Sequence, residues 1–281
     1  MKKLEIYKIW KSDYKISDFL ITQIILKNLK INQNQLFLLD EISDFESIKS
    51  DFELYSEGFP IEYILKTANF YSLDFYVDQR VLIPRNDTEI MIKTILDKVS
   101  KLDNFSLIDV WTWSGIIPIT ITKNAKNISN IYALDLSKKA LEVSKINLEN
   151  HNLINKIQSL NSDLLNICFE NKLNLTQNLI ISANLPYIKA WDKINMDKEV
   201  YTFEPELALY WWEKTGFELY EKLIFQAKTL KQNYNITNLY LYLEIGFDQY
   251  EYSKKYLTDL WLKFEYFKDL NNIWRCLQIE I

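Results

Sequence analysis

The chain has 281 residues, of which 48% are hydrophobic and 25% charged, a balance that indicates a globular protein of one large or two smaller domains. Its formal net charge is −5, whereas a surface that binds phosphates usually carries a surplus of basic residues. Composition therefore argues against stable nucleic-acid binding.

The two cysteines, Cys168 and Cys276, lie far apart and lack the spacing of metal ligands. This pattern predicts a reduced, cytoplasmic protein without a metal site. No apolar segment long enough for a signal peptide follows the first residues, and no apolar run approaches the length of a membrane span. We therefore expect no membrane partner.

Short amphipathic helices are expected over residues 1–70. Ser17 and Asp18 can cap a helix whose apolar residues over 19–26 are spaced to bury one face. Further helices are expected over 42–55 and 61–65. We treat residues 1–70 as an N-terminal helical domain, and residues 71–281 as a hairpin linker followed by a second domain.

Apolar alternation over 70–83 predicts a β-hairpin in which residues 81–83 form part of the second strand. Pro84 to Glu89 follow as a turn and a helix start. Asp87 or Thr88 can cap the helix that is expected over 90–99.

From residue 105 onward, strand and helix patterns alternate. Strands are expected over 105–110, 130–134, 156–160, 179–183 and 239–245, with helices between them that include 137–149 and 217–230. This alternation predicts an α/β fold, in which a mostly parallel sheet is covered on both faces. Two strands over 264–268 and 275–281 lie close in sequence and predict an antiparallel pair at the edge.

Acidic residues follow three successive strands of the predicted sheet. Asp109 closes the first strand, Asp135 closes the second, and Asp163 follows the third. Ligands of open α/β sheets bind outside the carboxyl ends of the strands, where aspartates can bind ribose hydroxyls or an adenine amine. One such aspartate alone is better read as a helix cap, but three together favour an adenosine site. The first loop lacks a P-loop lysine and a G-x-G-x-x-G pattern, which argues against nucleotide triphosphates and dinucleotides.

The turn Asn184-Leu185-Pro186-Tyr187 directly follows a predicted buried strand. It places an amide side chain, two backbone carbonyls and an aromatic ring at one strand end. That set can hold a planar nitrogen-bearing group, such as an amide or an exocyclic base amine. Asn-x-Pro is also an ordinary turn, but next to an adenosine-type site we favour the binding role.

In their order along the chain, these segments resemble the release-factor glutamine N5-methyltransferase family, the HemK type of class I methyltransferases that use S-adenosyl-L-methionine. The resemblance covers most of residues 58–281. Its segments are 63–65, 70–75, 81–89, Asp109–Gly115, Asn184–Tyr187 and Glu204–Leu209. It implies a Rossmann-like, seven-stranded methyltransferase sheet behind an N-terminal helical domain that recognises the substrate.

The resemblance also assigns roles to individual residues. The implied catalytic residues are Asn184, Leu185, Pro186 and Tyr187. The implied cofactor-binding residues are Asp109, Trp111, Thr112, Trp113, Ser114, Gly115, Asp135, Asp163, Leu164 and Asn184. The implied substrate is the side-chain amide of the glutamine in the Gly-Gly-Gln motif of class 1 peptide chain release factors.

Two alternatives to this function stay open. The Asn-Leu-Pro-Tyr tetrad also resembles that of the rRNA adenine dimethyltransferases, so an adenine N6-methyltransferase that acts on RNA or DNA is the second reading. In that case the tetrad holds a flipped base. A catalytically dead homologue that acts as a binding module is the third.

The chain departs from the family at its tryptophans. Those that stand where the family has glycine are Trp111, Trp113, Trp211, Trp212 and Trp261. The chain has 8 tryptophans and only 4 glycines, where average usage predicts roughly 20 glycines. We hypothesise that the gene reads UGA as glycine and that translation with UGA as tryptophan gave the sequence as written. The alternative is a degenerate homologue whose cofactor site is blocked. Leu185 replaces a proline, but the carbonyl acceptor there belongs to the backbone.

Overall fold

The chain folds into two units that divide between Thr67 and Ala68. The computed structural model describes residues 1–189, 202–205, 210–212 and 215–281, and for 13, 188–189 and 210–212 only the backbone is described. Phe203 belongs to the first unit, where its ring lies 5.1 Å from that of Phe59. The boundary expected at residue 70 falls slightly later, and it would separate two paired strands that the second unit keeps together.

The N-terminal unit consists of short helices around a core of its own. These are α1 (Lys3–Asp13), α2 (Asp18–Leu29), α3 (Gln33–Phe37), α4 (Phe45–Ser56) and α5 (Ile61–Leu65). Ser17 caps α2 as predicted, because its hydroxyl accepts a hydrogen bond from the Leu20 N–H at 3.3 Å. Buried isoleucines from α1, α2 and α4 pack around Trp10 and Phe52.

The second unit begins with a hairpin that is shorter than predicted. Strand β1 (Ala68–Phe70) pairs antiparallel with β2 (Leu73–Phe75). The two residues of the turn, Tyr71 and Ser72, have φ of 50° and 61°, and positive φ at both positions is typical of the tight turn that joins adjacent strands. The hairpin therefore closes within eight residues.

The prediction of a strand over residues 81–83 was wrong. Asp78 accepts hydrogen bonds from the backbone and the guanidinium of Arg80, and the Val81 N–H donates to the Asp78 carbonyl at 3.0 Å. The chain thus turns at 78–81 instead of pairing. A 3₁₀ helix, η1 (Asn86–Thr88), and helix α6 (Glu89–Val99) follow.

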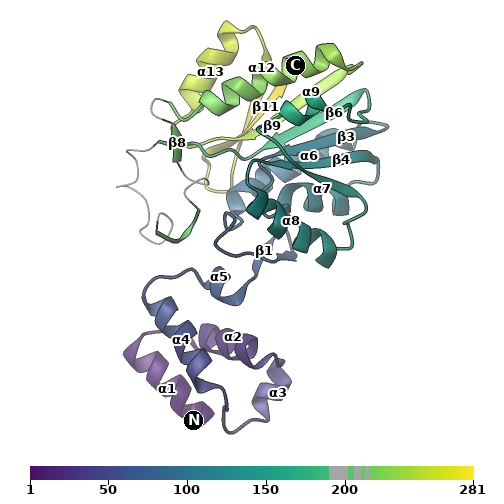
Figure 1. Cartoon of the computed structure of the whole chain (residues 1–281). Coiled ribbons are helices and arrows are strands. Elements are labelled where there is room, and N and C mark those ends of the chain that lie inside the picture. The colour runs from purple at the N-terminus through teal and green to yellow at the C-terminus, as the bar shows by residue number, and fades with distance from the viewer. Residues whose placement is uncertain (190–201, 206–209, 213–214) are drawn as a thin grey trace. The chain divides into compact units, whose positions relative to one another are not determined.

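A seven-stranded sheet forms the centre of the second unit, with the order β10-β11-β9-β6-β3-β4-β5 (Figure 1). Its strands are β3 (Phe105–Val110), β4 (Ile128–Asp135), β5 (Ile157–Asn161), β6 (Asn178–Ala183), β9 (Asn238–Glu244), β10 (Lys263–Lys268) and β11 (Trp274–Glu280). The strands β5, β4, β3, β6 and β9 are parallel, while β11 pairs antiparallel with both β9 and β10. The predicted α/β sheet and its antiparallel edge pair are confirmed. A separate short parallel pair joins β7 (Ile188–Lys189) and β8 (Tyr210–Trp212).

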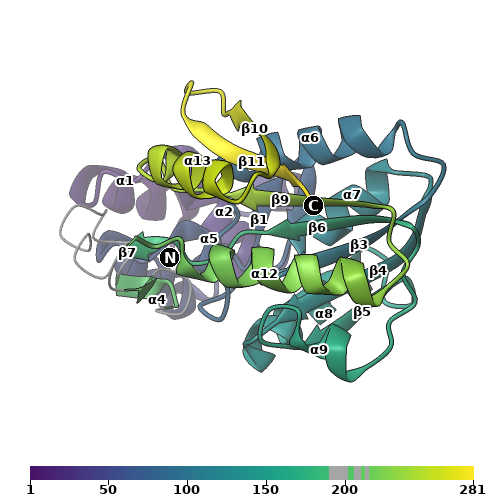
Figure 2. The same cartoon turned by 90° about the horizontal axis from the view of Figure 1, so that it is seen from above.

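Helices cover both faces of this sheet (Figure 2). One face carries α6 together with α7 (Ile116–Asn124) and α8 (Lys138–Asn150), which contact β9, β3 and β5 respectively. The other face carries α9 (Asn166–Glu170), α12 (Glu218–Asn233) and α13 (Tyr250–Asp259). Every residue of β3 is buried, as expected for a central strand covered on both sides.

Candidate functional site

The carboxyl ends of four neighbouring strands bring most of the predicted site residues together. In the order β9-β6-β3-β4, the strands are parallel, so the loops that follow them meet at one edge of the sheet. Asn184 follows β6, Trp111 follows β3 and Asp135 ends β4. The fourth strand, β9, ends at Glu244, which the sequence reasoning did not select.

Two buried aspartates hold the loops of this edge. Asp135 accepts hydrogen bonds from the backbone N–H groups of Trp113 at 2.9 Å and Ser137 at 2.8 Å. Asp109 accepts one from the Ser182 hydroxyl at 2.6 Å, across the β3–β6 pair. Burial raises the pKa of both carboxyls to about 7. In this conformation, both oxygens of Asp135 bind the backbone of the loops.

Trp111 and Trp113 adopt a backbone conformation that favours glycine. Their φ angles are 67° and 52°, in the left-handed region, which costs a residue with a Cβ roughly 1–2 kcal/mol. The side chains are only 3% and 5% exposed, and the two rings meet edge to face with centroids 6.0 Å apart. The Trp113 indole N–H donates to the Asn184 carbonyl at 3.1 Å. The indoles therefore fill the space between the β3 loop and the β6 loop.

The predicted catalytic turn is buried and closely packed. Asn184 and Leu185 are 6% and 1% exposed, and the Leu185 carbonyl accepts a long hydrogen bond, at 3.4 Å, from the Tyr220 hydroxyl. A Cβ on Gly246 would lie 3.1 Å from the Tyr187 ring, and one on Gly216 would lie 2.3 Å from the Tyr187 carbonyl oxygen. Side chains larger than glycine do not fit at these two positions without displacing Tyr187.

Four polar residues of the segment Pro84–Glu89 each bind a partner outside the segment. The long-range contacts are Arg85 with buried Glu204, Asp87 with Arg275 at 3.0 Å, Thr88 Oγ1 with Glu244 Oε2 at 2.5 Å, and Glu89 with the Tyr71 N–H at 3.1 Å. The predicted side-chain cap of α6 was therefore wrong, because Thr88 occupies the cap position without a capping hydrogen bond. This segment joins the hairpin, β9 and β11 beside the catalytic turn.

Glu244 is the residue that the sequence reasoning missed. It is 2% exposed, and burial raises its pKa to about 7, although hydrogen bonds from Thr88 and Asn184 and the charge of Arg275 act in the opposite direction. A signal was present in the sequence. A glutamate at the end of the apolar run 239–245 is unusual, because charged residues are seldom buried without a partner.

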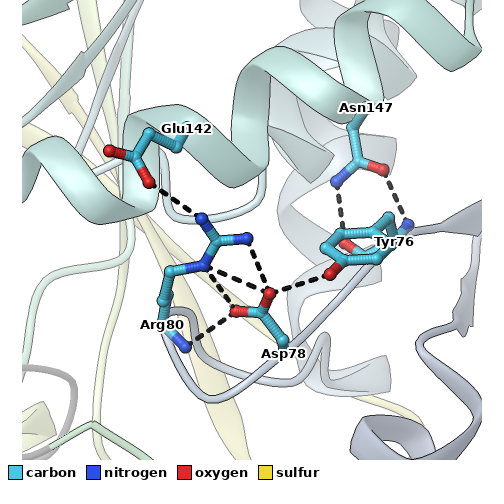
Figure 3. Close-up of polar contacts among 5 residues, drawn as sticks. All are labelled: Tyr76, Asp78, Arg80, Glu142 and Asn147. Atoms are coloured by element: carbon cyan, nitrogen blue, oxygen red, sulfur yellow. Dashed lines mark hydrogen bonds and ion pairs between the residues drawn. The ribbon is translucent and has the colours of Figure 1, made fainter.

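Asn147 of α8 connects the segment before Pro84 to the cofactor-type loop. Its amide donates to the carbonyls of Tyr76 and Ser114 at 2.9 Å each and accepts from the Tyr76 N–H at 2.7 Å. Figure 3 shows the neighbouring polar cluster, in which Arg80 bridges Asp78 and Glu142 of α8. These contacts fix residues 76–80 against α8.

Other predicted residues lie at the edge of this cluster of strand ends or outside the described part of the chain. Asp163 follows β5 and forms an ion pair with Lys222 at 2.6 Å, and Leu164 is buried with φ of 49°. Residues 206–209 of the Glu204–Leu209 stretch lie outside the described residues. Trp211 and Trp212 have only their backbone described, in β8.

The described part of the chain contains neither a candidate metal site nor a candidate membrane span. No group of three or more His, Cys, Asp or Glu residues there could hold a metal ion. None of the helices in the same residues is long and apolar enough to cross a membrane.

Comparisons with known proteins decide the family. No family model matches the chain. The release factor glutamine methyltransferase of Mycoplasma mycoides is 35% identical over 263 residues, which cover 92% of this chain and 86% of that protein. The chain belongs to the release factor glutamine methyltransferase family. The Lactococcus lactis member is 32% identical, with 87% of this chain and 81% of that protein covered.

A solved structure agrees with the fold of the family. The human methyltransferase 10 domain containing protein superposes with a TM-score of 0.53 at 14% identity, over 74% of this chain and 88% of that one. At this identity the likeness concerns the fold alone. It supports a Rossmann-like methyltransferase sheet for this member of the release factor glutamine methyltransferase family.

Proposed function

We propose that this protein transfers a methyl group from S-adenosyl-L-methionine to the side-chain amide nitrogen N5 of the glutamine in the Gly-Gly-Gln motif of class 1 peptide chain release factors, in the cytoplasm. The observation that carries the proposal is the Asn184–Tyr187 turn beside the β3 loop, with Asn184 and Leu185 buried, in a chain of this family. The turn offers acceptors for an amide, and the tetrad holds no carboxylate, imidazole or amine that could act as a base.

The reaction asks for positioning more than for proton transfer. An amide nitrogen is a poor nucleophile, because its lone pair is delocalised into the carbonyl. The Asn184 Oδ1 and the Leu185 carbonyl oxygen can each accept one N–H of a substrate amide. Two such hydrogen bonds fix the amide plane and present one face of the nitrogen to the methyl donor, and fixed geometry of this kind accounts for large rate gains. Tyr187 packs over the amide and keeps water out.

The residues as written do not fit the cofactor that this function needs. The sulfonium of S-adenosyl-L-methionine supplies the methyl group, and the family places it against the β3 loop. At the β3 loop the two indoles are buried, and the Trp113 indole N–H is hydrogen-bonded to the Asn184 carbonyl. The Ser114 hydroxyl, in contrast, is buried without a hydrogen-bond partner among the described residues, as expected in a polar ligand site.

We therefore propose that positions 111 and 113 are glycine in the functional protein. Glycine adopts φ of 67° and 52° without strain and lets the backbone approach a ligand. With glycine at positions 111 and 113, we propose that the remaining cofactor-binding residues implied by the resemblance bind S-adenosyl-L-methionine. The acidic residues among them are Asp109, Asp135 and Asp163.

Methylation of a full-length release factor by the chain with Trp111→Gly and Trp113→Gly tests the function. We expect mass spectrometry to find one methyl group on the motif glutamine. Asn184→Ala should lower turnover by roughly 10²-fold or more while the cofactor affinity is kept, because Asn184 acts on the acceptor amide. Asn178→Ala, at the other end of β6, is the matched control, since the Asn178 side chain hydrogen-bonds Asn104 and Asn238, away from Asn184.

Three outcomes separate the candidate functions. Labelling of an adenine in parallel incubations with rRNA would favour the alternative nucleic-acid methyltransferase. Tight cofactor binding without any transfer would favour a binding module. Turnover that survives Asn184→Ala within a few fold would contradict the amide-positioning mechanism.

A further inference from the structure

The orientation of the Asn184 side chain decides whether its amide helps or hinders the proposed reaction. An asparagine amide ends in an oxygen that accepts hydrogen bonds and a nitrogen that donates them. Rotation by 180° exchanges the two ends at little steric cost. The proposed function needs the oxygen end toward the substrate, so something must hold the nitrogen end toward the protein.

Two buried acceptors lie on the protein side of Asn184. The Asn184 Nδ2 donates to Thr88 Oγ1 at 3.5 Å, a long contact, and the polar interaction between the Asn184 amide and Glu244 acts to lower the pKa of that carboxyl. The Thr88 hydroxyl donates its single proton in a hydrogen bond to Glu244 Oε2, at 2.5 Å. Its lone pairs are then available only as acceptors. Above its raised pKa of about 7, Glu244 is ionised and can likewise only accept.

These acceptors are held by three separate elements. Thr88 lies at the start of α6 and is 1% exposed, Glu244 ends β9 and is 2% exposed, and Asn184 follows the adjacent strand β6. A flipped Asn184 would bring its oxygen against the oxygens of Thr88 and Glu244. It would also leave its buried N–H groups without these partners, and an unsatisfied buried polar group costs about 1–3 kcal/mol.

We propose that Thr88 and Glu244 are positioning residues that fix the Asn184 amide with its nitrogen toward the protein and its oxygen toward the substrate. This inference rests on the proposed function and deepens it. An Oδ1 fixed in this way accepts an N–H and repels a carboxylate. The site therefore takes an amide and rejects the corresponding acid, so a release factor with glutamate in place of the motif glutamine should not bind productively.

Paired variants of Thr88 test the proposal in the chain with glycine at 111 and 113. Thr88→Val keeps the shape and removes the hydroxyl, whereas Thr88→Ser keeps the hydroxyl. We expect Thr88→Val to lower kcat by roughly 10²-fold, with KM for the release factor and cofactor affinity changed by less than about threefold. Thr88→Ser should recover most of kcat.

Glu244→Gln tests the second acceptor, and Thr94→Val serves as the control. Gln can turn an N–H toward Asn184 and so favours the flipped amide, which predicts a loss of kcat as large as that of Thr88→Val. Thr94 is a buried threonine of the same helix whose hydroxyl donates to the Ile90 carbonyl at 2.6 Å, away from Asn184. Its valine variant should keep kcat, which shows that the loss is not a general effect of removing a buried hydroxyl.

A readout that needs no activity is the ¹⁵N spectrum of the Asn184 side-chain amide, assigned by Asn184→Asp. We expect slow exchange of its N–H protons with solvent in the parent, and fast exchange or loss of the signal in Thr88→Val and Glu244→Gln. Unchanged exchange in both variants, or unchanged kcat in both, would overturn the inference. If the parent transfers no methyl group at all, the proposed function fails, and the amide spectrum still decides the orientation.

Discussion

The backbone angles separate five tryptophans in the described part of the chain into two kinds. Trp111, Trp113 and Trp261 have φ of 67°, 52° and 53°, which L residues adopt only at a cost. Trp10 lies in α1 and stacks on Phe52 with ring centroids 4.3 Å apart, and Trp274 lies in β11. The three left-handed positions are also positions where the family has glycine. At these three positions a criterion from backbone geometry thus agrees with one from resemblance, whereas Trp211 and Trp212 lie in β8 and are assigned by resemblance alone.

This agreement leads to a prediction about the gene and the native protein. Codons 111, 113 and 261 should be UGA, as should codons 211 and 212, while codons 10 and 274 should be UGG. Peptide mass spectrometry of the protein from its own cells should find glycine at positions 111, 113 and 261 and tryptophan at positions 10 and 274. Genuine tryptophan at 111 and 113 would contradict the hypothesis and favour the degenerate homologue.

The cofactor site gives a second prediction at the residue scale. Trp111→Gly with Trp113→Gly should tighten S-adenosyl-L-methionine binding at least about tenfold, or ~1.4 kcal/mol, because two buried indoles leave the site. Calorimetry on the written and the substituted chains measures the difference. Trp261→Gly is the control, since Trp261 is 94% exposed and lies at the end of α13. Equal affinities would mean that the β3 loop does not contact the cofactor.

At the scale of elements, helix α13 ends in the way that glycine usually ends a helix. After the last turn, the Trp261 N–H donates to the Thr258 carbonyl at 3.0 Å and the Leu262 N–H donates to the Leu257 carbonyl at 3.2 Å. This pattern places residue 261 in the left-handed region, where glycine carries no Cβ penalty. Because the Trp261 indole is exposed, its packing contributes little stability to offset the strain of the positive φ.

We therefore expect Trp261→Gly to stabilise the protein by about 1 kcal/mol and to raise Tm by roughly 2–4 °C. Trp261→Ala is the matched variant, because alanine removes the indole but keeps the Cβ that opposes positive φ. Thermal unfolding should show a gain for glycine and little gain for alanine. Equal effects of the two substitutions would mean that the indole, not the backbone angle, sets the stability.

Sequence patterns predicted the elements whose cause is local. β3 and α5 begin and end where periodicity and breakers put them, and the Ser17 cap follows from its own side chain. The hairpin failed at residues 81–83, because a side chain of the turn, Asp78, competes with strand pairing. Apolar alternation alone carries no information on such a competition.

The candidate site was predictable only in part, for a related reason. Asn184, Asp109 and Asp135 stand at strand ends, so topology alone places them together. Thr88 and Glu244 meet across 156 positions of sequence, and no local pattern indicates that pair. The resemblance drew attention to Pro84–Glu89 but did not say what these residues bind.

In the molecule as a whole, the candidate site and an apolar groove lie on different units. The strand ends with Asn184 belong entirely to the second unit, which has its own buried core. The N-terminal unit exposes large apolar side chains, with Leu4 and Phe37 at 80% and 82% exposed around a groove of about 280 Å³. Exposed apolar residues beside a groove are typical of a surface that binds a partner.

We expect this surface to supply the binding energy that a small acceptor motif cannot. Three residues of a Gly-Gly-Gln peptide offer too little area to hold an amide in place, and substrates without remote contacts lose rate as well as affinity. With glycine at 111 and 113, the protein should therefore methylate a folded release factor with kcat/KM at least ~10²-fold above that for the short peptide.

The same argument predicts what happens when the groove is altered. Leu4→Ala with Phe37→Ala should lower kcat/KM for the folded release factor by roughly tenfold and leave kcat/KM for the peptide unchanged, because the peptide lacks the release-factor surface that is expected to bind the groove. Leu270→Ala is the control, since Leu270 is fully exposed in the turn between β10 and β11 of the other unit. Mass spectrometry of parallel reactions measures both substrates. An equal loss on protein and peptide would show that the substitutions act through the stability of the chain, and no loss on either would remove the N-terminal groove from substrate recognition.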